Sequence, residues 1–88
     1  MLDWPPMASL YQPLGASLGR QRGPAHALTF PEVEAILARP LPAAAHTGRR
    51  WWWTNAPGHS QADYGWLGTG WLIASVDRRR QMVTFRQE

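Results

Sequence analysis

The stretch Leu28-Thr29-Phe30-Pro31-Glu32-Val33 carries the clearest local signal in the chain. Thr29 and Glu32 have the spacing of a capping box, in which each side chain accepts the backbone N–H of the other residue at the start of a helix. Proline is tolerated in the first helical turn, where its missing N–H is not needed. We therefore expect a helix over residues 30–38, which ends before Pro40.

Further helical signals lie on both sides of this segment. Pro13 favours a helix start, and we expect a helix over residues 12–18. Residues 42–46 form either a short second helix, as in a helix-turn-helix, or a simple connection. A second capping signature at Ser60 predicts a helix over residues 61–67.

Runs of aromatic and β-branched residues predict three strands, at residues 49–54, 71–76 and 82–86. Alternation along the first strand would place Trp52 on the face opposite Trp51 and Trp53. The last two strands form a hairpin. Together the elements predict an α+β fold with a small three-stranded antiparallel sheet and three short helices. A winged helix is one fold of this kind.

The length of 88 residues fits one small domain. We expect an irregular or disordered tail over residues 1–8 and a single α+β domain over residues 9–88. Hydrophobic residues make up 44% and charged residues 17%, a balance that excludes intrinsic disorder. Because the chain has no cysteine, disulfides and thiol catalysis are excluded. The first residues lack the pattern of a secretory signal, and no apolar run is long enough to span a membrane, so we expect a cytoplasmic protein.

Arginine and tryptophan are both unusual in this composition. The chain has 6 Trp, its 9 basic residues are all Arg, and its net charge is +3. A GC-rich genome would also enrich arginine. Arginine nevertheless grips phosphate with two N–H groups and stacks on bases, so basic charge with aromatic residues indicates nucleic-acid binding.

Five motifs follow one another along the chain, at residues 11–18 (YxPLxxxL), 28–42 (LTFxExExILxRPLP), 51–55 (WWxxN), 60–71 (SQAxxxWLxxGW) and 83–86 (VTFR). In this order they resemble an uncharacterised small domain family of bacteria, found alone or beside nuclease-type domains. The resemblance implies DNA binding rather than catalysis, and it carries over no catalytic residue. Ala38 stands where that pattern has glycine, and Trp53 and Thr54 shift the phase of Asn55.

The candidate nucleic-acid contacts fall into three sets. The strongest is the hairpin loop with its consecutive arginines, which could also be a solvated turn. The second set consists of the other loop arginines, and the third of residues that could read or stack on bases near the start of the helix at 61–67. In sequence order, the residues are Arg20, Arg22, Arg49, Arg50, Trp52, Asn55, Ser60, Gln61, Arg78, Arg79 and Arg80. We expect the guanidinium groups to converge on one surface.

The sequence thus predicts a non-enzymatic module that binds nucleic acid, duplex DNA in particular, without metal or cofactor. Such a small module would act as a homodimer or with a nuclease or defence protein. The alternative is a protein-interaction adaptor or inhibitor that uses exposed Trp and Arg. An HNH-like nuclease built on His46, Asn55 and His59 is disfavoured, because a Pro-Gly turn separates Asn55 from His59.

Overall fold

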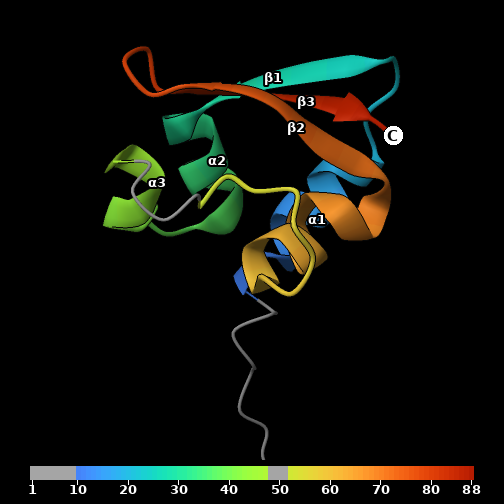
Figure 1. The fold of residues 1–88 in the computed structure, drawn as a ribbon, viewed down its shortest axis with the longest axis horizontal. Coiled ribbons are helices and arrows are strands. Elements are labelled where there is room, and N and C mark those ends of the chain that lie inside the picture. The colour runs from blue at the N-terminus through green and yellow to red at the C-terminus, as the bar shows by residue number, and fades with distance from the viewer. Residues whose placement is uncertain (1–9, 48–51) are drawn as a thin grey trace, which may run out of the picture.

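The computed structural model describes residues 10–47 and 52–88, which form a sheet with helices packed on one face (Figure 1). This arrangement confirms the α+β class. The elements in order are α1 (Gln12–Gly19), β1 (Ala25–Thr29), α2 (Phe30–Leu37), α3 (Ala43–Thr47), the π-helical turn η2 (Ala62–Trp66), the 3-10 turn η3 (Leu67–Thr69), β2 (Trp71–Asp77) and β3 (Met82–Gln87). The expected tail at residues 1–8 lies outside the described residues.

The sheet has the order β1-β3-β2, with β3 antiparallel to both neighbours. Phe85 of β3 lies opposite His26 of β1 and Ile73 of β2. The predicted hairpin of β2 and β3 is confirmed. A bulge between Ile73 and Ser75 shifts the register of β2.

One predicted strand is wrong. The third strand of the sheet is β1, at residues 25–29, whereas we expected residues 49–54. Residues 52–54 are not strand, and residues 49–51 lie outside the described residues. β1 is short and contains alanine, which strands disfavour, so its local signal is weak. It forms because β3 supplies its hydrogen bonds and Leu28 enters the core.

The predicted capping box is confirmed at the start of α2. The N–H of Thr29 donates to Glu32 Oε1 at 2.8 Å, and the N–H of Glu32 donates to Thr29 Oγ1 at 3.1 Å. The helix ends at Ala38 in the left-handed conformation, with φ 59°. Beyond this end, Glu34 Oε2 accepts the N–H of Leu41 at 2.7 Å, which fixes the connection to α3.

The region predicted as a regular helix at residues 61–67 is instead the π-helical turn η2 followed by the 3-10 turn η3. This region packs closely on α1 at Gly15. A Cβ on Gly15 would lie 2.5 Å from the carbonyl oxygen of Tyr64 and 2.8 Å from that of Gly65. Only glycine therefore allows α1 and η2 to approach this closely.

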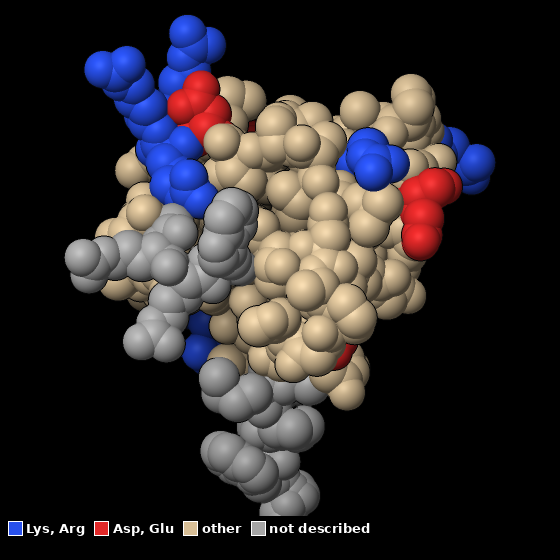
Figure 2. All heavy atoms as spheres, viewed as in Figure 1, with Lys and Arg blue, Asp and Glu red and all other residues tan. Residues whose placement is uncertain are grey.

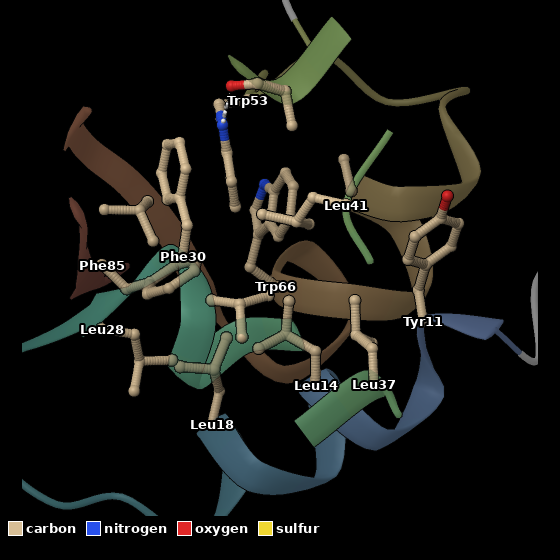
Figure 3. Close-up of a cluster of buried hydrophobic side chains, with 14 of the residues drawn as sticks. Tyr11, Leu14, Leu18, Leu28, Phe30, Leu37, Leu41, Trp53, Trp66 and Phe85 are labelled. Atoms are coloured by element: carbon tan, nitrogen blue, oxygen red, sulfur yellow. Dashed lines mark hydrogen bonds between the residues drawn. The ribbon is translucent and has the colours of Figure 1, made fainter. Parts of the chain in front are cut away.

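An aromatic cluster fills the core between the sheet and the helices (Figure 3). Trp53 stacks between Phe30 and Trp66, with ring centroids 5.3 Å and 5.7 Å away. Both indoles also have polar partners, since Trp53 Nε1 donates to the carbonyl of Ala45 at 3.0 Å and Trp66 Nε1 to that of Thr54 at 2.9 Å. The cluster thereby holds α3 and the segment after Trp53 against the sheet.

The alternation expected for Trp52 and Trp53 does not occur, because both residues are buried. The Trp52 side chain is 7% exposed, and its ring lies edge-on to Tyr11 and Trp53. Residues that do not form a strand do not alternate between two faces. Consecutive tryptophans at positions 52 and 53 can therefore both enter the core.

Candidate nucleic-acid interface

The loop between β2 and β3 is fixed at its base. Asp77 Oδ1 accepts the N–H of Arg80 at 3.0 Å, and the N–H of Gln81 donates to the carbonyl of Arg78 at 3.3 Å. Gln81 has a left-handed backbone, with φ 56°, and its carbonyl accepts the N–H of Phe30 at 2.7 Å. The loop is therefore tied both to its own strand and to the start of α2.

The side chains of Arg78, Arg79 and Arg80 are exposed at the tip of this loop. Figure 2 shows basic side chains projecting from this corner of the molecule, beside an acidic group. Arg80 Nε lies 3.8 Å from Asp77 Oδ2, a long and exposed ion pair that contributes little to stability. Three arginines and one aspartate leave the tip with a charge of +2, from 3 − 1. We call residues 77–81 the hairpin tip.

The short helix α3 lies at the same end of the molecule as the hairpin tip (Figure 1). Its exposed His46 contacts Phe30 edge-on, with ring centroids 5.4 Å apart. Phe30 in turn joins the hairpin tip through its bond to Gln81. His46 therefore places an exposed polar side chain at the same end of the molecule as the hairpin tip.

Arg20 and Arg22 lie at the other end of the sheet. They are exposed in the loop before β1, whose first residue, Ala25, pairs with Arg86. The hairpin tip adjoins the opposite ends of these strands, where Asp77 pairs with Met82. β3 runs over residues 82–87 and is about 20 Å long, so the arginines of the hairpin tip lie that far from Arg20 and Arg22. The structure therefore does not bring these arginines together on one surface.

The residues predicted to read bases have structural partners. Asn55 accepts the N–H of Ile73 at 2.8 Å and donates to its carbonyl at 3.0 Å, which closes the outer edge of β2 at this residue. Gln61 Nε2 donates to the carbonyl of Trp52 at 3.0 Å. Both amide groups thus hold the chain around the tryptophan cluster, and reading a base would require them to leave these partners.

Ser60 is half-buried just before η2 and does not have the capping role that the sequence suggests. The N-cap position of η2 is Gln61, whose side chain makes no capping bond. Asp63 instead reaches back, and its carboxylate accepts the N–H of Gly58 at 3.1–3.2 Å. The turn at Pro57 and Gly58 is confirmed, with Gly58 at φ 99°.

The described tryptophans are all buried, at positions 52, 53, 66 and 71. Among the described residues, Tyr64 is the exposed large hydrophobic side chain, at 46%. The expectation that exposed tryptophan serves a base or a protein partner therefore finds no support in the described part of the chain. The candidates Arg49 and Arg50 lie outside it.

Within residues 10–47 and 52–88, no group of three or more His, Asp or Glu side chains could hold a metal ion. No helix in the same ranges is long and apolar enough to cross a membrane. His46, Asn55 and His59 are each exposed, and Asn55 is engaged with the backbone of β2.

Two residues that shape the hairpin tip were missed in the sequence analysis. Asp77 precedes the arginines at the first position of the turn, where aspartate commonly accepts a backbone N–H two or three residues later, so turn chemistry could have identified it. Gln81 has no such signal, because its role depends on the distant Phe30.

The chain matches a known family model over residues 11–88, that of a domain of unknown function, DUF7662. No curated protein and no solved structure matches the chain. The matched range includes the described elements from α1 to β3.

Proposed function

The chain belongs to the DUF7662 family, and we propose that it is a non-enzymatic module that binds nucleic acid, duplex DNA in particular, through its hairpin tip. The observation that carries the proposal is a run of exposed arginines on a loop whose base is fixed by Asp77 and by the bond between Gln81 and Phe30. A fixed base limits the backbone entropy that is lost on binding.

The chemistry of the tip suits a polyanion. Guanidinium groups bind phosphate oxygens with paired N–H groups, and this contact is insensitive to base sequence. Arginines on a narrow loop also suit a minor groove, where the negative potential is enhanced. Because Asn55 and Gln61 are engaged with the backbone, contact with phosphate rather than base reading is the main source of the proposed affinity.

A winged-helix-like arrangement is part of the proposal. α2 and α3 are joined by a sharp connection, and the β2–β3 hairpin projects beside them as a wing would. The end of the molecule that carries His46 and the hairpin tip would then face the nucleic acid. α3 is short, at five residues, so the hairpin would contribute more of the contact than the helix.

We also propose a cytoplasmic setting in bacteria. The motif resemblance implies nuclease-type partner domains, and beside such a domain the module would supply affinity for DNA. A single module of this size covers too little surface for tight specific binding, so a partner or a second copy would add to it.

Binding is tested by fluorescence anisotropy with labelled duplex DNA, single-stranded DNA and duplex RNA. The variant Arg78→Ala/Arg79→Ala/Arg80→Ala should lose at least about tenfold in affinity for duplex DNA, since each lost phosphate contact weakens binding. Wild-type protein should prefer duplex DNA over the other probes. Equal binding of all three probes would reject the preference for duplex DNA.

The matched control is Arg20→Ala/Arg22→Ala/Arg86→Ala. It removes the same charge from exposed positions at the other end of the sheet. If the control loses as much affinity as the hairpin variant, net charge rather than the hairpin tip explains binding, and the proposal fails.

A further inference from the structure

The two edges of the sheet are closed to different extents. On the edge formed by β2, Asn55 occupies both backbone groups of Ile73, and a bulge follows. On the edge formed by β1, Glu32 accepts the N–H of Thr29. The remaining part of this edge, at Ala25 and Ala27, is exposed.

The hydrogen-bond pattern shows which groups of β1 point outward. The N–H of Gln87 donates to the carbonyl of Pro24 at 3.0 Å, and the N–H of Phe30 donates to that of Gln81 at 2.7 Å. In an antiparallel pair, residues whose N–H and C=O groups bond to the neighbouring strand alternate with residues whose groups point away from it. The even-numbered residues of β1 therefore bond to β3. The N–H and C=O groups of Ala25 and Ala27 therefore point away from the sheet.

We propose that two copies of the chain pair along β1, antiparallel, about a two-fold axis at His26. In this register Ala25 of one copy lies opposite the partner's Ala27, and every outward N–H and C=O of these alanines gains a partner. The two three-stranded sheets then form one continuous sheet. The register does not need the N–H of Thr29, which the capping box already uses.

The side chains and charges around this edge suit a second copy. β1 has the sequence AHALT, without Lys, Arg, Asp, Glu or proline, the residues that commonly protect an edge strand from pairing. The alanine side chains leave room for a neighbouring strand. The same register places the loop before β1, which carries Arg22, at the same end of the paired strands as the first turn of the partner's α2, which carries the partner's Glu32, so residues of opposite charge lie at both ends of the pair.

The first test measures association by sedimentation equilibrium from micromolar to near-millimolar protein. Wild-type chain should form a reversible dimer. Ala27→Pro removes an outward N–H but no bond to β3, so it should weaken the dimer by about tenfold or more while the fold, followed by circular dichroism, is retained. Ala27→Thr keeps the N–H and suits a strand, and it should still form the dimer.

The second test uses the absence of cysteine from the chain. In the proposed register His26 and the partner's His26 form a non-hydrogen-bonded pair, with Cα atoms about 4.5 Å apart, within the range of a disulfide. Oxidation of His26→Cys by diamide, which takes up the two hydrogens of the thiols, should therefore give a covalent dimer. The exposed Ala35→Cys on α2 is the control for chance collision.

Faster cross-linking of His26→Cys than of Ala35→Cys, together with loss of the dimer in Ala27→Pro, supports the pairing. A wild-type chain that stays monomeric throughout the concentration range overturns it. So does a dimer that Ala27→Pro leaves unchanged, because that dimer would use another surface. Capture of an added extended peptide by β1 in a monomeric wild-type chain would assign the edge to a different occupant and also overturn the proposal.

Discussion

Asn55 shows how a single side chain secures an edge of the sheet. It makes a pair of hydrogen bonds to the backbone of Ile73, across 18 positions in the sequence. Asn55→Ala should lower the free energy of unfolding by about 1 kcal/mol, since both bonds are lost at a solvent-exposed site. Urea denaturation measures the change. Asn55→Asp keeps an acceptor for the N–H of Ile73 but cannot donate to its carbonyl, so it should fall between alanine and wild type. If both variants are as stable as wild type, the two hydrogen bonds of Asn55 contribute nothing to the free energy of unfolding.

Tyr11 makes the free energy of unfolding depend on pH in the alkaline range. Burial raises the pKa of Tyr11, and the Arg39 guanidinium opposes the rise. The folded protein therefore holds the phenol proton to higher pH than the unfolded chain does. Its stability contribution is complete below pH of about 10 and is lost as pH rises through the folded pKa. Thermal unfolding across this range should show a smaller loss of stability in Tyr11→Phe than in wild type, and an equal loss would contradict this assignment.

At the scale of elements, the contact between α1 and η2 depends on a single glycine. Gly15→Ala should destabilise the fold by roughly 2–3 kcal/mol, because its Cβ would meet backbone carbonyl oxygens rather than a flexible side chain. Gly19→Ala is the matched control in the same helix. A Cβ on Gly19 would meet only Thr69 Cγ2, at 3.8 Å. Its substitution should be neutral or stabilising, and equal losses in denaturant midpoint would contradict the close approach.

The charge of the hairpin tip can be raised without altering the turn. Asp77→Asn keeps an oxygen that accepts the N–H of Arg80 but removes the carboxylate beside its guanidinium. If the tip binds phosphate, affinity for duplex DNA should rise about two- to fivefold, in line with the modest energy of an exposed charge pair. Anisotropy titration at low salt measures the rise. Weaker binding with an intact fold would mean that Asp77 itself contacts the ligand.

Elements with their own end signals could be predicted from the sequence. The capping box located α2, Pro13 located α1, and strong β propensity on both sides of a charged turn located the hairpin. β1 could not be found in this way, because its stability comes from β3, more than 50 residues later in the chain. The run of tryptophans was wrongly predicted as a strand for a related reason, since aromatic residues suit a strand and a packed core equally well.

The candidate site was predictable only in part. The exposed arginines of the hairpin tip follow from their position in a turn, since three adjacent charges cannot all be buried. Their distance from Arg20 and Arg22 depends on which strands pair, and the error in the first strand concealed it. Trp52, Asn55 and Gln61 are polar or aromatic residues near a turn, yet their partners are the core and the backbone.

At the scale of the whole molecule, arginine side chains lie at both ends of the sheet, with the hairpin tip at one of them (Figure 2). A polyanion can therefore engage the hairpin tip without contacting the other end. In the dimer proposed above, each tip connects the outer strand β2 to the central strand β3, and the hydrogen bonds of the β1 pair use no residue of the tip. Arg78→Ala/Arg79→Ala/Arg80→Ala should therefore leave the dimer unaffected, whereas Arg20→Ala/Arg22→Ala/Arg86→Ala removes Arg22 from the dimer contact and should weaken it.

The salt dependence of duplex DNA binding tests the central claim most directly. If the three arginines of the hairpin tip each neutralise a phosphate, the logarithm of affinity should fall against the logarithm of salt concentration with a slope of about −2.7 per chain. Arg20→Ala/Arg22→Ala/Arg86→Ala should keep this slope, and Arg78→Ala/Arg79→Ala/Arg80→Ala should bring it close to zero. A flat dependence in the wild-type protein, or the same slope in the hairpin variant, would contradict binding through the hairpin tip.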